Sequence, residues 1–129
     1  MRIRAIAALV AGCLLVLSSM AHAFLGWPAV LAELNEINAS AEFISGLRAG
    51  WLFGSTSMLA FGLIVLVYAV QLWRGKDAER KPSAIIAVCY LIFGIGAFFT
   101  TNFDPHFIGF IVIGLIVGFA STGNGKRVE

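Results

Sequence analysis

The chain of 129 residues is 60% hydrophobic and only 12% charged, whereas an average soluble domain has roughly 45–50% apolar residues. Its formal net charge of +2 comes from short clusters at the ends of hydrophobic segments, so we expect a lipid bilayer around it and no nucleic-acid partner. Four spans of about 20 residues each would nearly fill this length. The composition therefore predicts an all-α, small polytopic membrane helical bundle in one domain, residues 1–129, with no separate soluble catalytic domain.

The first hydrophobic segment, residues 1–25, has two interpretations that stay open. As a cleaved signal peptide it has Arg2 and Arg4 at its start, an apolar stretch over residues 5–17 and a small-x-small site at residues 21–23. As a retained transmembrane helix it continues through Phe24 and Leu25 and reaches about 20 apolar residues. The choice sets the number of spans at three or four and leaves the orientation of the later segments unchanged.

Residues 28–45 carry more polar side chains than the segments on either side. Pro28 suits the first turn of a helix. Apolar residues follow at helical spacing, at Val30, Leu31, Leu34, Ile37, Ala41 and Ile44. Glu33, Glu36 and Glu42 would then face water. The pattern predicts an amphipathic helix that lies along the outer surface of the membrane.

Three further segments are apolar enough to cross the bilayer: residues 46–73, 84–101 and 107–122. The last two are short, because about 16 helical residues reach roughly 24 Å of the roughly 30 Å hydrocarbon core. Between them, residues 102–105 are Asn-Phe-Asp-Pro, in which Asp104 can cap a helix and Pro105 can occupy its first position. These two segments are therefore expected to form an antiparallel hairpin.

All Lys and Arg residues except Arg48 fall on one side of this arrangement. They lie in the N-terminal segment, in the loop of residues 74–82 and in the tail of residues 123–129. By the positive-inside rule this side is cytoplasmic. The expected location is the plasma membrane, which in a bacterium is the inner membrane, with the C-terminus in the cytoplasm.

Small residues that let helix backbones approach each other are the main packing signal in membranes. Such residues recur on one face of each later segment. The glycines expected at helix contacts are Gly46, Gly50, Gly54, Gly94, Gly114 and Gly118. Contacts within the chain are the leading interpretation. Self-association into a homo-oligomer, or contact with other membrane subunits, would use the same pattern and stays open.

Polar side chains gather at the outer ends of the segments, and His22, Arg48, Asp104 and His106 form a candidate outer polar cluster. In one interpretation these residues anchor and cap helix ends. In the other, Arg48 forms an ion pair with Asp104 across the bundle, because an unpaired carboxylate below the headgroups is costly. Trp51, one helical turn from Arg48, is expected to stack on it. Two histidines fall short of the four ligands of a structural zinc site, so neither a metal nor a cofactor is expected.

No phosphate-binding glycine loop, zinc-binding helix motif or nucleophile elbow occurs in the sequence, so no catalytic residue is assigned. The leading hypothesis is a non-enzymatic membrane subunit or structural component. One alternative is a small oligomeric channel or transporter that assembles around Ser55, Thr56, Thr100 and Asn102. A second alternative is a membrane enzyme or cofactor-binding protein that uses the outer polar cluster.

Overall fold

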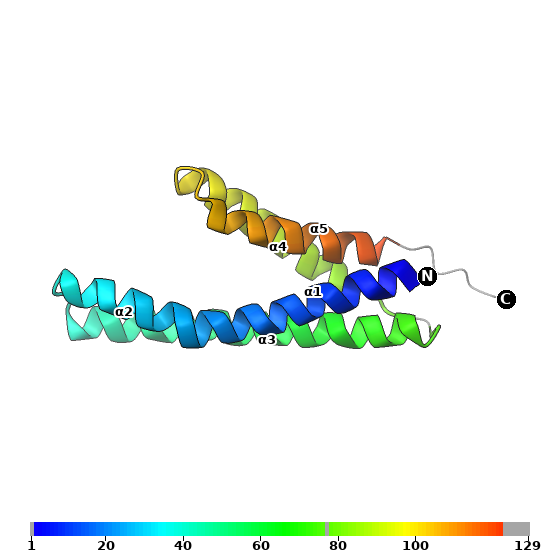
Figure 1. Cartoon of the computed structure of the whole chain (residues 1–129), viewed down its shortest axis with the longest axis horizontal. Coiled ribbons are helices and arrows are strands. Elements are labelled where there is room, and N and C mark those ends of the chain that lie inside the picture. The colour runs from blue at the N-terminus through cyan, green and yellow to red at the C-terminus, as the bar shows by residue number, and fades with distance from the viewer. Residues whose placement is uncertain (1, 77, 123–129) are drawn as a thin grey trace.

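The computed structural model describes residues 2–76 and 78–122, and within these ranges every regular element is a helix. In chain order the elements are α1 (Arg2–Ala21), a π-helical turn (His22–Gly26), α2 (Trp27–Glu36), α3 (Ala41–Trp73), α4 (Lys81–Thr100), a 3-10 turn (Pro105–Phe107) and α5 (Ile108–Ser121). Three helical stretches are long and apolar enough to cross a membrane, and a shorter apolar helix follows them. Figure 1 shows two antiparallel hairpins, a long one formed by α1, α2 and α3 and a shorter one formed by α4 and α5. The expected tail, residues 123–129, lies outside the described residues.

The first arm of the long hairpin is one helical stretch, because α1 continues through the π-helical turn into α2. Arg2–Glu36 spans 35 residues, roughly 52 Å at 1.5 Å per residue. It ends at residues 37–40, where Asn38 adopts a left-handed backbone conformation with φ 52°. The Ser40 hydroxyl then caps α3 by accepting a hydrogen bond from the Phe43 N–H at 3.2 Å. The single amphipathic helix expected over residues 28–45 is therefore not formed: its first part extends the first helix, and its last residues begin α3.

Two glycines, one on each helix, let α1 and α3 approach closely. A Cβ added at Gly62 would lie 2.8 Å from Val16 Cγ2 and 3.0 Å from the Val16 backbone nitrogen. A Cβ added at Gly12 would lie 3.1 Å from the Leu66 backbone nitrogen. Neither glycine belongs to the set expected from the sequence. The close approach fully buries three side chains of α1, those of Ala8, Ala11 and Leu15.

The shorter hairpin uses the same kind of contact at two glycines that were expected from the sequence. A Cβ at Gly94 would lie 2.9 Å from the Ile111 backbone nitrogen. A Cβ at Gly114 would lie 3.1 Å from the Leu91 backbone nitrogen. Each glycine thus faces the backbone of the opposite helix, which brings α4 and α5 into direct contact along one face.

The turn between α4 and α5 follows the Asn-Phe-Asp-Pro pattern. Asn102 and Phe103 both adopt left-handed conformations, with φ 54° and 64°. Asp104 Oδ1 accepts a hydrogen bond from the His106 backbone N–H at 2.9 Å, and Pro105 opens the 3-10 turn. Asp104 therefore caps the start of the returning arm, as the sequence predicts.

The remaining glycines expected at helix contacts have room around them. A Cβ at Gly46 or Gly50 would meet no atom within 4 Å, and one at Gly54 would meet only His22 Nε2, at 3.8 Å. A Cβ at Gly118 would make an ordinary contact with the Ala87 Cβ at 3.7 Å. The reason for the difference on α3 is position, because Gly46 and Gly50 lie in its first turns, where α2 rather than α1 runs alongside. Regular spacing on one helix does not show where the neighbouring helix comes close.

The two hairpins share one core, and it lies at one end of the molecule. Its members are Ala8, Ala11 and Leu15 of α1, Val65, Tyr68 and Ala69 of α3, Ile86, Ala87 and Tyr90 of α4, and Val117 and Ala120 of α5. The Tyr68 hydroxyl crosses between the hairpins and donates a hydrogen bond to the Ala120 carbonyl oxygen at 3.1 Å. From this end the hairpins diverge toward the turn between α4 and α5, as Figure 1 shows.

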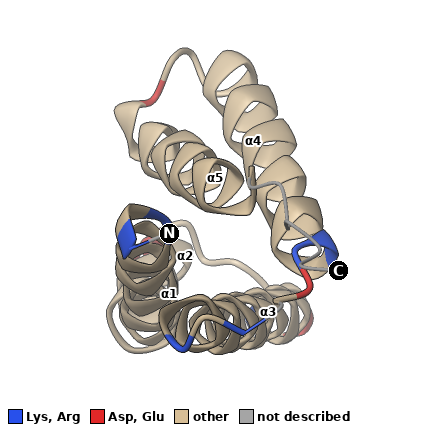
Figure 2. Cartoon of the chain, turned by 90° about the vertical axis from the view of Figure 1, so that its right-hand side faces the viewer, with Lys and Arg blue, Asp and Glu red and all other residues tan. Residues whose placement is uncertain are grey.

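The joined end of the molecule also carries most of the described basic side chains. Figure 2 views the molecule from this end and shows Lys and Arg at the near ends of α1, α3 and α4. This placement follows from topology, because α1 and α4 begin here and α3 and α5 end here. We call this end the basic end, and the opposite end, with residues 37–40 and 101–104, the distal end.

Candidate functional site

The four residues of the outer polar cluster lie away from the basic end, two on each hairpin. His22 begins the π-helical turn, is half-buried and lies beside Gly54 of α3. Arg48 is exposed on α3, and Asp104 and His106 are exposed in the turn between α4 and α5. Because the hairpins diverge in this half of the molecule, the four side chains are divided between them.

The ion pair considered between Arg48 and Asp104 is not formed. Arg48 belongs to the long hairpin and Asp104 to the tip of the shorter one, and these parts lie apart in Figure 1. The contact that the structure gives to the Asp104 carboxylate is the capping hydrogen bond to the His106 backbone N–H. Asp104 therefore caps the start of the 3-10 turn, which was the other interpretation considered for it.

Trp51 stacks on His22 instead of on Arg48. The two ring centroids are 4.1 Å apart with their planes 7° from parallel, and Trp51 Nε1 donates a hydrogen bond to the His22 carbonyl oxygen at 2.7 Å. That carbonyl also accepts the Trp27 backbone N–H, which is the i to i+5 bond of a π-helical turn. Gly26 makes room for the indole, because a Cβ there would lie 2.8 Å from Trp51 Cζ2. The π-helical turn and Trp51 together hold the His22 ring beside α3.

A cavity of about 290 Å³ lies between the two hairpins, next to their shared core on its distal side. We call it the interhairpin cleft. The long hairpin lines it with His22, Gly54, Met58 and Phe61, and the shorter hairpin with Cys89, Tyr90, Phe93 and Phe110. The α3 residues are spaced by about one helical turn and therefore share one face of that helix. The cleft thus depends on both hairpins.

The walls of the interhairpin cleft are largely aromatic. Phe93 meets Phe110 edge to face at 5.0 Å, and Tyr90 stacks on Phe110 at 5.7 Å. Phe61 meets Tyr90 from the opposite hairpin at 6.3 Å, with the rings at 74°. The His106 ring lies 6.2 Å from the Phe110 ring. The second histidine is therefore adjacent to a wall of the cleft, while His22 lines the cleft directly.

Two equally buried tyrosines differ in whether their hydroxyl groups form a hydrogen bond. Tyr68 and Tyr90 are each 5% exposed. The Tyr68 hydroxyl donates to the Ala120 carbonyl oxygen, whereas the Tyr90 hydroxyl has no hydrogen-bond partner among the described residues. Buried hydroxyls nearly always have a partner. Tyr90 lines the interhairpin cleft, but its hydroxyl oxygen is itself enclosed by the surrounding protein.

The hydroxyl groups considered as the lining of a channel are bonded within their own helices. Ser55 donates to the Trp51 carbonyl oxygen at 3.1 Å, and Thr56 donates to that of Leu52 at 2.9 Å. Thr100 donates to the Gly96 carbonyl oxygen at 2.9 Å. Such bonds are the usual way for Ser and Thr to be satisfied within a helix. The donors of these three hydroxyl groups are therefore used within their own helices.

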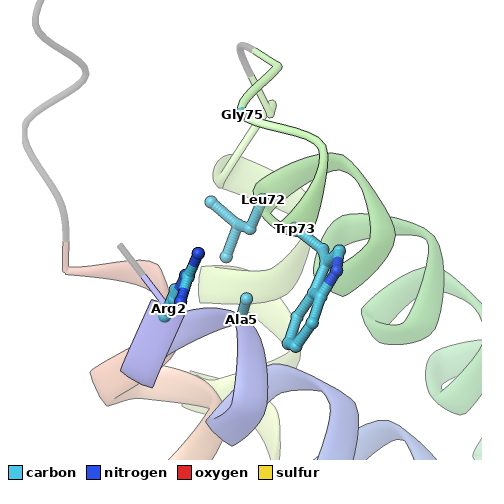
Figure 3. A pocket seen from close by; sticks show the side chains of 5 residues that line it. All are labelled: Arg2, Ala5, Leu72, Trp73 and Gly75. Atoms are coloured by element: carbon cyan, nitrogen blue, oxygen red, sulfur yellow. The ribbon is translucent and has the colours of Figure 1, made fainter.

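A second hollow, of about 320 Å³, opens at the basic end (Figure 3). Arg2 and Ala5 at the start of α1 lie across it from Leu72 and Trp73 at the end of α3 and from Gly75 just after that helix. Trp and Arg are typical of the membrane–water interface. The exposed Arg2 and Trp73 side chains at this hollow are therefore of the types that contact lipid headgroups.

Metal-binding side chains are scattered over the described part of the chain, where no three His, Cys, Asp or Glu residues come together at a metal-binding distance. Cys13 and Cys89 are both free and exposed. Comparisons with protein-family models, with curated proteins and with solved structures find no match. The interhairpin cleft, which combines aromatic walls with a histidine, is the candidate functional site.

Proposed function

We propose that this chain is a non-enzymatic component of the plasma membrane that spans the bilayer four times. Its three longest helical stretches have 35, 33 and 20 residues, which meets or exceeds the roughly 20 residues that a span requires. The shorter helix α5 completes a hairpin with α4. The cluster of basic side chains favours the cytoplasm for the basic end, including the loop of residues 74–82 and the C-terminal tail. In a bacterium the membrane would be the inner membrane.

In this proposal the distal part of the long hairpin projects from the outer surface. Its first arm is roughly 52 Å long, and the hydrocarbon core is roughly 30 Å thick. The exposed carboxylates Glu33, Glu36 and Glu42 belong to the projecting part. The shorter hairpin is then contained almost entirely within the bilayer.

The first helix is a retained span in this proposal and not a cleaved signal. α1 supplies Ala8, Ala11 and Leu15 to the shared core, and the Ser19 hydroxyl donates to the Ser55 carbonyl oxygen at 2.8 Å. Small side chains in close contact and hydrogen bonds between helices are the interactions that hold membrane helices together. Cleavage after residue 23 would remove all of them together with His22, so retention is supported by the packing.

The role that we propose for this component is to bind an apolar partner in the interhairpin cleft. One observation carries the proposal: each hairpin is closely packed within itself, but the two share a core only toward the basic end, which leaves a largely aromatic cavity between them. Clefts between the helices of a bundle are frequent ligand sites. A purely structural bundle would gain dispersion energy by closing such a cleft.

Native mass spectrometry of the protein released from its membrane in mild detergent tests this role. We expect a bound small molecule on the unmodified chain and its loss in Gly54→Leu, because Gly54 lines the cleft and the added side chain occupies it. Gly50→Leu is the matched control, since Gly50 lies one turn earlier on α3 with no atom within 4 Å of its Cβ position. Equal occupancy in both variants, or no adduct on any of the proteins, would contradict a binding role for the cleft.

A channel or transporter role has less support, because the Ser55, Thr56 and Thr100 hydroxyls are bonded within their helices. The two roles separate in reconstituted vesicles. A binding component leaves ion permeability at the level of empty vesicles, whereas permeability that rises in proportion to the amount of protein would replace our proposal with the channel hypothesis.

A further inference from the structure

We propose that the hollow at the basic end is a binding site for the headgroup of an anionic phospholipid. This inference rests on the proposed placement of the basic end at the cytoplasmic surface of the bilayer, and not on the binding role of the interhairpin cleft. The two cavities lie at opposite ends of the shared core. Three features of the hollow carry the inference: its mixed lining, the charge around it and the backbone groups beside it.

The lining of the hollow combines one charged side chain with an apolar wall. Arg2 is the charged member, and Ala5, Leu72 and Trp73 supply the apolar wall (Figure 3). A phospholipid has the same division, because its charged phosphate is attached to hydrocarbon chains. The guanidinium group is a planar fork that matches two phosphate oxygens, and tryptophan is enriched at the level of the headgroups. The lining therefore fits the part of a lipid where phosphate and chains meet.

The side chains around the hollow determine the sign of the ligand. The described basic residues at this end are Arg2, Arg4, Arg74, Lys76, Arg80 and Lys81. Glu79 is the one carboxylate among the described residues of this end, and it precedes α4, whereas α1 and α3 border the hollow. A basic side chain near the surface strengthens binding of an anionic lipid about fivefold. A zwitterionic headgroup would bring its own cation into this positive field, so a lipid with a net negative charge is favoured.

The backbone beside the hollow also favours an anion. α1 begins at Arg2, so its first N–H groups, which no helical bond uses, lie here with the positive end of the helix dipole. The carbonyl groups at the end of α3 are already occupied. The Gly75 N–H donates to the Leu72 carbonyl oxygen at 3.1 Å, and the Lys76 N–H donates to that of Gln71 at 3.0 Å. Free donors therefore meet no competing row of free acceptors, which suits a phosphate group.

The apolar wall selects a lipid phosphate over a soluble one. Trp73 is 62% exposed, and an inorganic phosphate bound to Arg2 would leave its ring uncovered. The chains attached to a lipid phosphate would cover this ring and the Leu72 side chain. The volume of about 320 Å³ lies at the lower end of the range for small-molecule sites, about 300–1,000 Å³. It suits one headgroup with the start of its chains.

Tryptophan quenching by brominated lipids tests the site in the full chain. The protein is placed in nanodiscs of phosphatidylcholine with a minor fraction of a second lipid, brominated close to its headgroup, that is either phosphatidylglycerol or phosphatidylcholine. Bromine quenches the tryptophans that it touches. Trp51 lies roughly 33 Å along α3 from Trp73, so Trp73→Phe identifies the contribution of the hollow. Salt at about 0.5 M, where the screening length is about 4 Å, suppresses attraction by distant charges.

We expect the anionic lipid to quench Trp73 more strongly than phosphatidylcholine at the same fraction, and we expect this difference to be absent from Trp73→Phe. Arg2→Gln should lower the preference for the anionic lipid by about three- to fivefold. Lys81→Gln is the matched control, because it removes one positive charge at the start of α4, outside the lining. It should leave the preference unchanged. Inorganic phosphate, added at constant ionic strength, should not compete.

The possible contrary results have different meanings. Equal quenching of Trp73 by the two lipids, or a difference that persists in Trp73→Phe, would overturn the headgroup site and leave the placement in the bilayer intact. Equal losses in Arg2→Gln and Lys81→Gln would replace the site with a diffuse attraction to the basic end. Competition by inorganic phosphate would assign the hollow to a soluble anion. If neither lipid quenches Trp73, the proposed placement of the basic end fails with the inference.

Discussion

Gly62→Ala should destabilise the protein, because the position has no space for a Cβ. The added atom would lie 2.8 Å from Val16 Cγ2, 3.0 Å from the Val16 backbone nitrogen and 3.1 Å from Leu15 Cβ. The Val16 side chain can adjust, but its backbone nitrogen moves only if α1 moves away from α3. Overfilling a packed contact costs about 1–3 kcal/mol, and Ala in place of Gly in a helix returns about 0.5–1 kcal/mol. We therefore expect a net loss of about 0.5–2 kcal/mol in the free energy of unfolding.

Gly50→Ala is the matched control on the same helix. It adds the same atom at a position with no neighbour within 4 Å, so only the gain in helix propensity remains, at most about 1 kcal/mol. Reversible unfolding in mixed micelles with increasing SDS, followed by tryptophan fluorescence, compares the two variants. If Gly62→Ala is as stable as Gly50→Ala, α1 and α3 do not approach as closely as described, and the explanation of the long hairpin fails.

Three further comparisons test individual hydrogen bonds, the first two in the same unfolding assay and the third by hydrogen exchange. Tyr68→Phe should lower stability by about 0.6 kcal/mol, a typical value for a bond between membrane helices, whereas Tyr90→Phe should cause no loss in the absence of a ligand; an equal loss in both would mean that the Tyr90 hydroxyl is bonded. Asp104→Ala should cost about 1 kcal/mol and Asp104→Asn much less, because Asn also caps helices; equal losses would favour an electrostatic role for the carboxylate. Ser40→Ala should increase hydrogen exchange at the start of α3, near Phe43, by the loss of about 1 kcal/mol of capping free energy, and unchanged exchange would contradict the cap.

The sequence was sufficient to predict which segments of the chain form apolar helices. Composition alone located the helices that became α3, α4 and α5 to within a few residues at most ends, because long apolar runs leave few alternatives. The turn at residues 102–105 was also predictable, since capping by Asp104 and the fixed φ of Pro105 are local effects. The start of α3 at Ala41 was missed because its signal, capping by Ser40, lies inside an amphipathic pattern that reads as one helix.

The contacts between helices could not be read from the sequence. Gly46 and Gly50 have the regular spacing of a packing motif, yet the close contact of α3 is at Gly62, because the position of α1 decides which face is covered. Likewise Trp51 is one turn from Arg48 in sequence, but the π-helical turn brings His22 to it instead.

The interhairpin cleft also could not be predicted from the sequence. Cys89, Tyr90 and Phe93 look like ordinary lipid-facing residues of α4, and only the divergence of two hairpins turns them into the wall of a cavity. Burial of the Tyr90 hydroxyl without a partner depends on elements distant in the chain. No pattern within one segment could have shown it.

The proposal that the two hairpins form one membrane domain depends most directly on α1, which supplies part of the shared core and, with the turn that follows it, one wall of the cleft. Intact-mass analysis of the protein purified from its membrane measures whether this helix is retained. Retention predicts a single species at the full chain mass of 13.8 kDa, apart from modification of the initiator Met. A species that begins at Phe24 would contradict the core, the position of His22 and the proposed binding site together.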